Sequence, residues 1–174
     1  TLFEQGKYDE AVEFFSRKLR NHPNDPAANF YMGRSLLAVD KPEEANGFLE
    51  KAVRLEPKNA DFHFWLGVGY WAAMDFSKEK QCYYKALELD PDHLSANLYL
   101  GHNYLDQNQW EIALAQYDRV LGIAPDIPEA LYNRAIALEK LGRLKPAVAA
   151  WKSYLNRYRS GNWAIHAAEQ LRQH

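Results

Sequence analysis

The sequence contains a single cysteine, Cys82, among 174 residues. One thiol excludes an intramolecular disulfide framework and any metal site built from a cysteine cluster. The sequence also lacks an apolar run near the ~20 residues that a bilayer-spanning helix needs. Its formal net charge is −2, from 21 Lys and Arg against 23 Asp and Glu. Nucleic-acid binding needs a basic surface that displaces counterions from phosphates, so this class of partner is excluded.

Motifs of familiar catalytic and nucleotide-binding sites are missing as well. There is no phosphate-binding glycine loop, no Gly-x-Ser-x-Gly and no His-Glu-x-x-His. Gly67-Val68-Gly69 lies inside a helical pattern with no strand before it, which argues against a phosphate loop. His63 and His102 lie on neighbouring helices but about 7–8 Å out of register, too far apart to share a metal ion. We therefore predict no catalytic residue, no metal and no cofactor.

What the sequence has in abundance is aromatic residues, 14% of the chain, and an internal repeat. Four prolines, each 34 residues from the next, give its period: Pro23, Pro57, Pro91 and Pro125. Two further columns keep this spacing, one of small and one of large apolar residues: Gly33, Gly67, Gly101 and Ala135; Phe15, Leu49, Tyr83, Tyr117 and Trp151. A period of this length indicates a repeat architecture in which neighbouring units stack to bury their apolar faces.

Each repeat contains two helices. Apolar residues recur at steps of three and four, as on one helix face, and the prolines separate one repeat from the next. The predicted helices cover 8–21, 26–39, 42–55, 60–73, 76–89, 94–107, 110–123, 128–141, 144–158 and 162–173. We predict one all-α domain over 1–174, divided into a partial repeat at 1–25, full repeats at 26–59, 60–93, 94–127 and 128–161, and a capping helix at 162–174.

This pattern resembles the tetratricopeptide repeat family. The residues that carry the resemblance are Leu66-Gly67 with Tyr70, Leu100-Gly101 with Tyr104, Ala113 with Tyr117, and Lys-Ala-Leu-Glu-Leu-Asp-Pro at 85–91. The resemblance implies a right-handed superhelical solenoid of antiparallel helix pairs, in which the first helix of each pair lines the concave side. It also implies a role in protein binding rather than catalysis.

The sequence departs from the family pattern in two places. The family's usual Trp early in the first helix is replaced by Asn29, His63, Asn97 and Leu131. Glu79 stands in a column of small residues and faces Gly67 and Gly69. We expect its side chain to extend outward past these glycines and to loosen this helix pair.

The concave side of the first helices is predicted to be aromatic and apolar, becoming polar toward the end of the chain. The predicted partner-binding residues are Tyr31, Arg34, Phe64, Trp65, Val68, Trp71, Tyr99, His102, Tyr132 and Asn133. Contiguous exposed apolar surface marks interaction sites, and Trp, Tyr and Arg dominate binding hot spots. Core packing is the alternative, and we favour it for the column of Phe30, Phe64 and Tyr132. Partner contact is favoured for Tyr31, Trp65, Trp71 and Tyr99, where packing does not require a ring.

Two specific functions of the family are rejected because their residues are missing. Co-chaperone modules that hold the C-terminal carboxylate of heat-shock chaperones use Lys, Asn and Arg at set positions. Those positions here hold Phe30, Arg34, Trp65, Ser95 and Tyr99. The asparagine ladder of the O-linked sugar transferases is matched at Asn133 alone.

The last helix is expected to cover the final pair and to present a polar outer face. Its predicted inward residues are Ala164, Ile165, Ala168 and Leu171. Its predicted solvent-facing residues are His166, Gln170 and Gln173.

The leading hypothesis is a non-catalytic scaffold that binds a segment of a partner protein in the concave groove. The alternative is a helper in envelope or polysaccharide assembly that binds glycan in the same groove. A second copy of the molecule could also fill it, so self-association stays open. The sequence begins at Thr1 without an initiator methionine or a leader, and we expect it to be a fragment of a longer chain. The compartment stays open, and we favour the cytoplasm over the periplasm.

Overall fold

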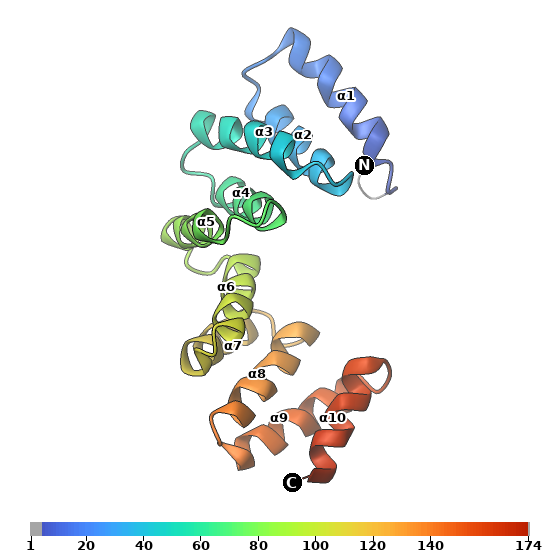
Figure 1. Ribbon diagram of the computed structural model, residues 1–174, viewed down its shortest axis with the longest axis vertical. Coiled ribbons are helices and arrows are strands. Elements are labelled where there is room, and N and C mark those ends of the chain that lie inside the picture. Colours follow the sequence, from blue (N-terminus) through green and yellow to red (C-terminus); the bar gives the residue numbers. More distant parts are fainter. Residues whose placement is uncertain (1–4, 174) are drawn as a thin grey trace. The chain divides into compact units, whose positions relative to one another are not determined.

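The computed structural model describes residues 5–173 as α-helices joined by short turns, in two compact units that divide between His93 and Leu94. Unit 1 contains α1 (Tyr8–Asn21), α2 (Pro26–Ala38), α3 (Pro42–Leu55), α4 (Ala60–Ala72) and α5 (Phe76–Leu89) (Figure 1). Unit 2 contains α6 (Leu94–Asp106), α7 (Trp110–Ile123), α8 (Pro128–Lys140), α9 (Leu144–Arg157) and α10 (Asn162–Gln173). That the repeats form one domain stays a prediction.

The predicted all-α fold class is confirmed, since the described residues form helices and no strand. Every helix begins at its predicted residue and ends within one residue of its predicted end. Local chemistry explains the starting points. The side chain of Asp25 accepts a hydrogen bond from the Ala28 backbone N–H at 2.9 Å, and Asn59 and Asp75 cap α4 and α5 in the same way. Pro26 stands at the first position of α2, where a missing N–H costs nothing.

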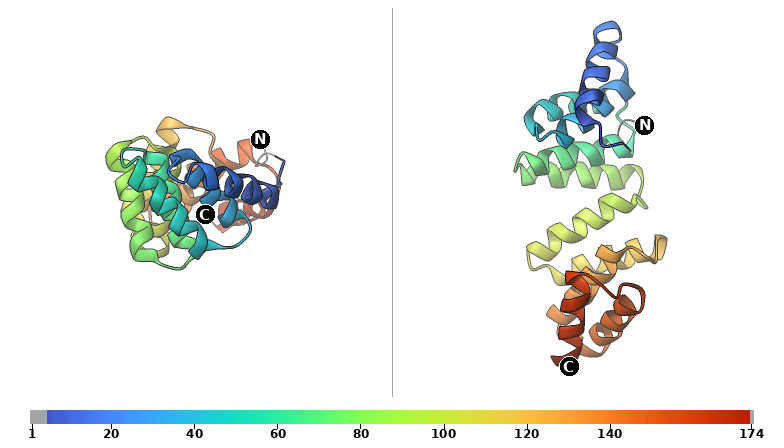
Figure 2. Two further views of the ribbon diagram at one scale, coloured as in Figure 1. Left: turned by 90° about the horizontal axis from the view of Figure 1, so that it is seen from above. Right: turned by 90° about the vertical axis from the view of Figure 1, so that its right-hand side faces the viewer.

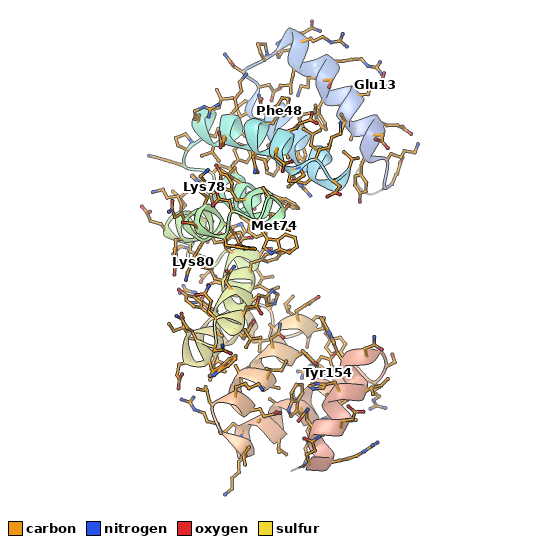
Figure 3. The ribbon with its side chains drawn as sticks, in the orientation of Figure 1. Glu13, Phe48, Met74, Lys78, Lys80 and Tyr154 are labelled. Atoms are coloured by element: carbon orange, nitrogen blue, oxygen red, sulfur yellow. The ribbon has the colours of Figure 1, made fainter. Side chains whose placement is uncertain are left out.

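The turns inside the helix pairs share one left-handed residue at the 34-residue spacing. The angle φ is 59° at Asp40, 60° at Met74, 59° at Asn108 and 69° at Gly142. Glycine adopts this conformation without cost, and Asn and Asp tolerate it better than other residues. Met74 is the exception, and its side chain at the α4–α5 turn is 78% exposed (Figure 3). No packing of the Met74 side chain therefore offsets the strained backbone at this turn.

Close contact between the two helices of a pair depends on the column of small residues. Figures 1 and 2 show α4 and α5 side by side. A Cβ atom at Gly67 of α4 would lie 2.5 Å from Cε1 of Tyr83 on α5. A Cβ at Gly101 would lie 2.7 Å from Cε1 of Tyr117. The large side chain of each second helix thus occupies the space that the glycine leaves.

Glu79 does not extend outward, and that prediction is wrong. Its side chain is 1% exposed and lies in the first turn of α5, where the positive end of the helix dipole favours a carboxylate. The space beside the glycines is taken by other residues. Gly67 contacts Tyr83, and the carbonyl of Gly69 accepts a hydrogen bond from Nδ2 of Asn46 at 3.3 Å.

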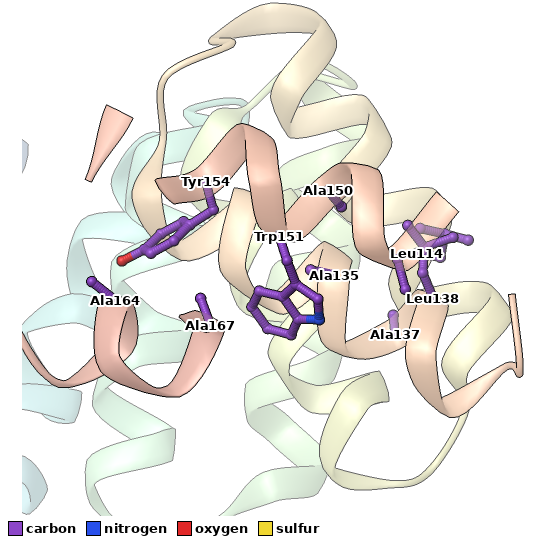
Figure 4. Packing of buried hydrophobic residues seen from close by; sticks show 10 residues of the cluster. Leu114, Ala135, Ala137, Leu138, Ala150, Trp151, Tyr154, Ala164 and Ala167 are labelled. Atoms are coloured by element: carbon purple, nitrogen blue, oxygen red, sulfur yellow. The ribbon is translucent and has the colours of Figure 1, made fainter. Parts of the chain in front are cut away.

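The core of unit 2 is built around Trp151 and Tyr154 of α9. Trp151 is fully buried, and its Nε1 donates a hydrogen bond to Oε2 of Glu139 at 3.2 Å. Figure 4 shows Ala164 and Ala167 of α10 facing these two rings. The prediction that α10 covers the last helix pair is therefore confirmed.

The predicted faces of α10 are wrong in part. Ile165, expected to point inward, is 60% exposed, whereas His166, expected in solvent, is half-buried against Tyr132. Because His166 packs on this ring, α10 is turned so that Ala167 rather than Ile165 enters the core. Ala168 and Leu171, which were predicted to point inward, are partly buried. Of the two glutamines predicted to face solvent, Gln173 is exposed and Gln170 is half-buried.

Candidate functional site

Five of the predicted binding residues lie on the first helices of unit 1 with part of each side chain exposed: Tyr31, Arg34, Trp65, Val68 and Trp71. We call this set the α2–α4 face. The two helices contact each other through Phe30 and Phe62, whose rings stack with their centroids 4.6 Å apart. Both phenylalanines are 6% exposed. This buried stack fixes α2 beside α4.

The ring of Tyr31 packs against a residue of α1. Its ring is stacked on Phe15 at 5.6 Å between centroids with an interplanar angle of 14°. Phe15 in turn contacts the edge of Phe14. Tyr31 nevertheless remains 40% exposed, so a fixed ring faces the solvent.

Arg34 connects the aromatic residues of the α2–α4 face. Its guanidinium carbon lies over the Trp65 ring, 4.1 Å from the centroid, and is 5.5 Å from the Phe30 centroid and 5.9 Å from that of Tyr31. Burial lowers the pKa of Arg34, while Tyr31 and Asp61 act in the opposite direction. Arginine nevertheless stays charged in proteins, so a half-buried cation lies among three rings.

Trp71 is the most exposed aromatic residue of the α2–α4 face, at 55%. It lies in the last turn of α4, close in sequence to two other exposed apolar residues, Met74 and Phe76. Val68, one turn earlier, is half-buried. This end of α4 is therefore rich in exposed apolar side chains.

Phe64 lies in the core of unit 1, with 5% of its side chain exposed. Its ring is stacked on Tyr83 at 5.7 Å between centroids and lies 5.1 Å from the ring of His93. Nε2 of His93 is 3.1 Å from Oδ1 of Asp61, which joins the end of unit 1 to the first turn of α4. Phe64 is thus part of the core beneath the α2–α4 face, where its ring contacts that of Trp65 edge-on at 5.7 Å between centroids.

In unit 2, the ring of His102 contacts the rings of Tyr99 and Tyr117, each at 5.9 Å between centroids. The side chain of Asn133 interacts with the Tyr117 hydroxyl and lowers its pKa, although burial raises that pKa by more. Burial lowers the pKa of His102, while Asp106 and Glu129 raise it less. His102 is therefore neutral at pH 7. Burial also raises the pKa of Tyr117, so its hydroxyl keeps its proton.

Tyr132 contacts the capping helix. Its ring is stacked on Trp163 of α10 at 5.0 Å, and its hydroxyl oxygen is 2.8 Å from Nδ1 of His166. It also meets Trp151 and Tyr154 edge-on. These contacts leave Tyr132 half-buried within unit 2.

Sequence reasoning missed three residues that shape these surfaces: Phe15, Asp61 and Trp163. Phe15 belongs to the column of large apolar residues, and this position could have predicted its support of Tyr31. Asp61 shares the second position of the first helices with Ala27, Ser95 and Glu129, which gives no common signal.

Metal-binding and membrane-spanning features are missing over residues 5–173. In this range no group of three or more His, Cys, Asp or Glu side chains could hold a metal ion. No helix in the same range is long and apolar enough to cross a membrane. Burial raises the pKa of the Cys82 thiol to about 11, so the reactive thiolate is scarce at neutral pH.

Four family models match the chain. Models described as "Tetratricopeptide repeat" match residues 2–63, 60–93 and 129–160, and one described as "TPR repeat" matches residues 101–142. The chain belongs to the tetratricopeptide repeat family. The all-helical fold of antiparallel helix pairs that the resemblance implied is the fold described above.

Solved structures of other tetratricopeptide repeat proteins share the fold. A crystal structure of MamA is 20% identical, covers 99% of this chain and 95% of its own, and has a TM-score of 0.77. YrrB, described as a TPR protein with an unusual peptide-binding site, is 20% identical over 97% of this chain and 87% of its own, with a TM-score of 0.76. TTC0263, a thermophilic TPR protein from Thermus thermophilus, is 22% identical over 98% and 93% of the two chains, with a TM-score of 0.72. No curated protein matches the sequence.

Proposed function

We propose that this tetratricopeptide repeat protein is a non-catalytic scaffold, and that its α2–α4 face binds a segment of a partner protein. The observation that carries the proposal is the exposure of Tyr31 and Trp71, 40% and 55%, on the two helices that also carry the pair of Arg34 and Trp65. Single exposed apolar residues are common on protein surfaces, but grouped exposed aromatic residues mark interaction sites. Trp, Tyr and Arg are also the side chains that contribute most to binding hot spots.

The rigidity of the rings favours tight binding. Tyr31 is stacked on Phe15, and Trp65 lies beneath the Arg34 guanidinium. Side chains that are already ordered lose less conformational entropy when a ligand binds. The α2–α4 face is thus suited to a short segment with aromatic or aliphatic anchors.

The family and its fold support the same role. Repeat proteins of stacked helix pairs expose extended binding surfaces. YrrB, which shares the fold, is described as having a peptide-binding site. The argument from YrrB is an analogy at the level of the fold, and the exposed residues of this chain carry the proposal.

Unit 2 offers a weaker candidate surface. Tyr99, His102 and Asn133 are half-buried, and Tyr132 contacts Trp163 and His166. We therefore assign the main binding role to unit 1 and treat the unit 2 residues as secondary contacts.

In the test, peptides that bind the intact protein are selected from a phage-displayed library of random sequences. The selected peptides are then synthesised, and their affinities are measured by calorimetry. Trp71→Ala and Tyr31→Ala should each weaken binding by about tenfold or more, as expected for hot-spot residues. Tyr84→Ala is the matched control, because Tyr84 is 46% exposed but lies on the second helix α5. If Trp71→Ala and Tyr31→Ala both bind the selected peptides with the affinity of the unchanged protein, the proposal is contradicted. Binding of oligosaccharides on a glycan array, with no peptide selected, would favour the glycan-binding alternative instead.

A further inference from the structure

The helix α9 differs in charge from the other second helices of the repeats. Exposed acidic residues occur on those four helices: Asp9 on α1, Glu43 on α3, Glu88 on α5 and Glu111 on α7. The helix α9 contains neither Asp nor Glu. Residues 140–174 contain one acid, Glu169, and seven basic residues: Lys140, Arg143, Lys145, Lys152, Arg157, Arg159 and Arg172. A chain whose net charge is −2 therefore concentrates positive charge in the last part of unit 2.

One side of α9 is a row of exposed residues that includes two lysines. Lys145, Ala149, Lys152 and Asn156 follow one another at steps of three and four, and all four are exposed. The opposite side of the helix carries Trp151, which is fully buried in the core of unit 2 (Figure 4). The packing of α9 thus turns both lysines toward the solvent.

Two arginines extend this charge beyond the ends of the helix. Arg143 stands at the N-cap position of α9, Arg159 follows two residues after its end, and both are exposed. We call Arg143, Lys145, Lys152 and Arg159 the α9 basic stripe. Within residues 5–173 their side chains form no ion pair, whereas Arg157 is paired with Asp126 at 2.7 Å. The charges of the stripe are therefore available to an external anion.

Lys145 stands at a position where the fold itself favours an acid. It lies in the first turn of α9, where the positive end of the helix dipole repels a cation. The equivalent positions of other second helices, spaced by multiples of 34 residues, hold Asp9, Glu43 and Glu111. Helix stability therefore does not explain a lysine here.

We propose that the α9 basic stripe binds the surface of a membrane rich in anionic lipids. Clusters of about four to eight Lys and Arg residues on an amphipathic helix bind such surfaces, because the attractions add without matched contacts. Leu144, which is 49% exposed between Arg143 and Lys145, can enter the headgroup region. All residues of the stripe belong to unit 2, so the proposal is independent of the α2–α4 face.

The composition of the stripe favours a lipid surface over a protein partner. Exposed ion pairs contribute little to a protein interface one by one, and stable interfaces have an apolar centre. Between its two lysines the stripe offers Ala149 and Asn156, which provide no large apolar side chain. A charged lipid surface needs no such centre, because its potential acts on each cation separately.

Cosedimentation of the intact protein with lipid vesicles tests the proposal. The protein should sediment with vesicles in which about a third of the lipid is phosphatidylglycerol, and not with vesicles of phosphatidylcholine alone. Raising the salt concentration from about 0.05 M to about 0.5 M should release it, because ions screen the attraction. Absence of binding to the anionic vesicles, or equal binding to both kinds, overturns the proposal.

A double variant locates the binding on the stripe. Lys145→Gln with Lys152→Gln removes two charges and should lower the partition coefficient for anionic vesicles about twenty-five-fold, at about fivefold per charge. Arg20→Gln with Lys58→Gln is the matched control, because it removes two exposed charges from unit 1. The control should change the partition coefficient by less than about twofold. If it loses as much binding as the stripe variant, net charge and not the stripe determines binding, and the assignment is wrong.

Lys145→Glu separates binding from folding. A glutamate in the first turn interacts favourably with the helix dipole, so the melting temperature should not fall. The charge changes by two units, so binding to anionic vesicles should weaken about twenty-five-fold. If Lys145→Glu binds these vesicles as well as the unchanged protein does, the proposal is wrong.

Other occupants of the stripe give different results. Calorimetric binding of soluble polyglutamate, without binding to vesicles, would assign the stripe to an acidic protein segment. Dimers that light scattering detects at low salt and that the double variant loses, again without vesicle binding, would assign it to a second copy of the chain. Either result overturns the membrane proposal. Peptides selected on the α2–α4 face should bind the double variant of the stripe with unchanged affinity, so the failure of one proposal leaves the other standing.

Discussion

The hydroxyl oxygen of Tyr132 lies 2.8 Å from Nδ1 of His166, a residue 34 positions later in the chain. The two residues stand in the same column of the repeat, so α10 continues the period although its sequence was assigned to a cap. The column of Ala28, Phe62, Ala96 and Ala130 ends at Ala164, and all five side chains are buried. The helix α10 therefore occupies the place of a further first helix.

The Tyr132–His166 hydrogen bond should stabilise the docking of α10. Tyr132→Phe keeps the stack on Trp163 but removes the hydroxyl, and should lower the free energy of unfolding of unit 2 by about 1 kcal/mol. Urea unfolding followed by tryptophan fluorescence measures the change. His166→Ala should cost more, because it also removes the ring contacts of His166 with Tyr132 and Trp151. Adding Tyr132→Phe to His166→Ala should cost little further, since the hydrogen bond is already lost. An unchanged midpoint in Tyr132→Phe would contradict the assignment.

Two glycines of unit 1 should respond to alanine with opposite signs. Gly67→Ala would place a Cβ atom 2.5 Å from Tyr83, and the displaced ring should cost about 1–3 kcal/mol of stability. Gly47 lies inside α3, and a methyl group added there would meet nothing within 4 Å, so Gly47→Ala should stabilise by about 0.5–1 kcal/mol through helix propensity. Thermal unfolding of both variants provides the comparison. If Gly67→Ala and Gly47→Ala change the stability equally, helix propensity and not the contact with Tyr83 determines the effect at Gly67.

Met74 should be replaceable with a gain in stability. Its φ of 60° is strained for a side chain with a Cβ, and its exposed side chain contributes little packing. Met74→Gly should therefore raise the free energy of unfolding by about 1 kcal/mol, as measured by chemical denaturation. Gly142→Ala at the equivalent turn of unit 2, where φ is 69°, should have the reverse effect. A loss of stability in Met74→Gly would indicate that its side chain packs in solution.

The stability of unit 2 should depend on pH through His102. Burial lowers the pKa of His102 in the folded protein from the ordinary value of 6.5, so protons bind more readily to the unfolded chain. Stability should therefore fall as the pH decreases from about 6.5 toward the lowered pKa, and it should be independent of this group above that range. In His102→Gln, the free energy of unfolding should depend less on pH over this range. If its slope against pH is the same as in the unchanged protein, His102 is not the cause of the pH dependence.

The helix bounds could be predicted because they depend on local signals. Proline and capping residues such as Asp25 and Asn59 set the starts of the helices, and these signals need no knowledge of tertiary contacts. The place of Glu79 could not be predicted in this way. A carboxylate in a column of small residues suggests exposure, whereas its position in the first turn of α5 compensates for its burial.

The side chains of the candidate site could be assigned to first helices, and core packing was favoured for Phe30 and Phe64, which are 6% and 5% exposed. The contacts that hold these side chains in place could not be predicted. Phe64 and Trp65 are adjacent in sequence, yet Phe64 is 5% exposed and packs on Tyr83 while Trp65 is half-buried under Arg34. The contact of Arg34 with Trp65 joins residues almost one repeat apart, and no local pattern predicts it. The same holds for α10, where the register with Tyr132 rather than hydrophobicity decides which face is buried.

The Phe30–Phe62 stack and the Tyr132–His166 hydrogen bond each join residues no more than one repeat apart. Contacts of such short sequence separation close small loops, so chain entropy slows folding little and the rate should be high for a protein of this length. Successive helix pairs can also form and open stepwise along the chain, since each depends mainly on its neighbours. Backbone amides of α8 and α10 should therefore lose their protection from hydrogen exchange when Tyr132 is changed, whereas those of α2 and α3 should keep theirs.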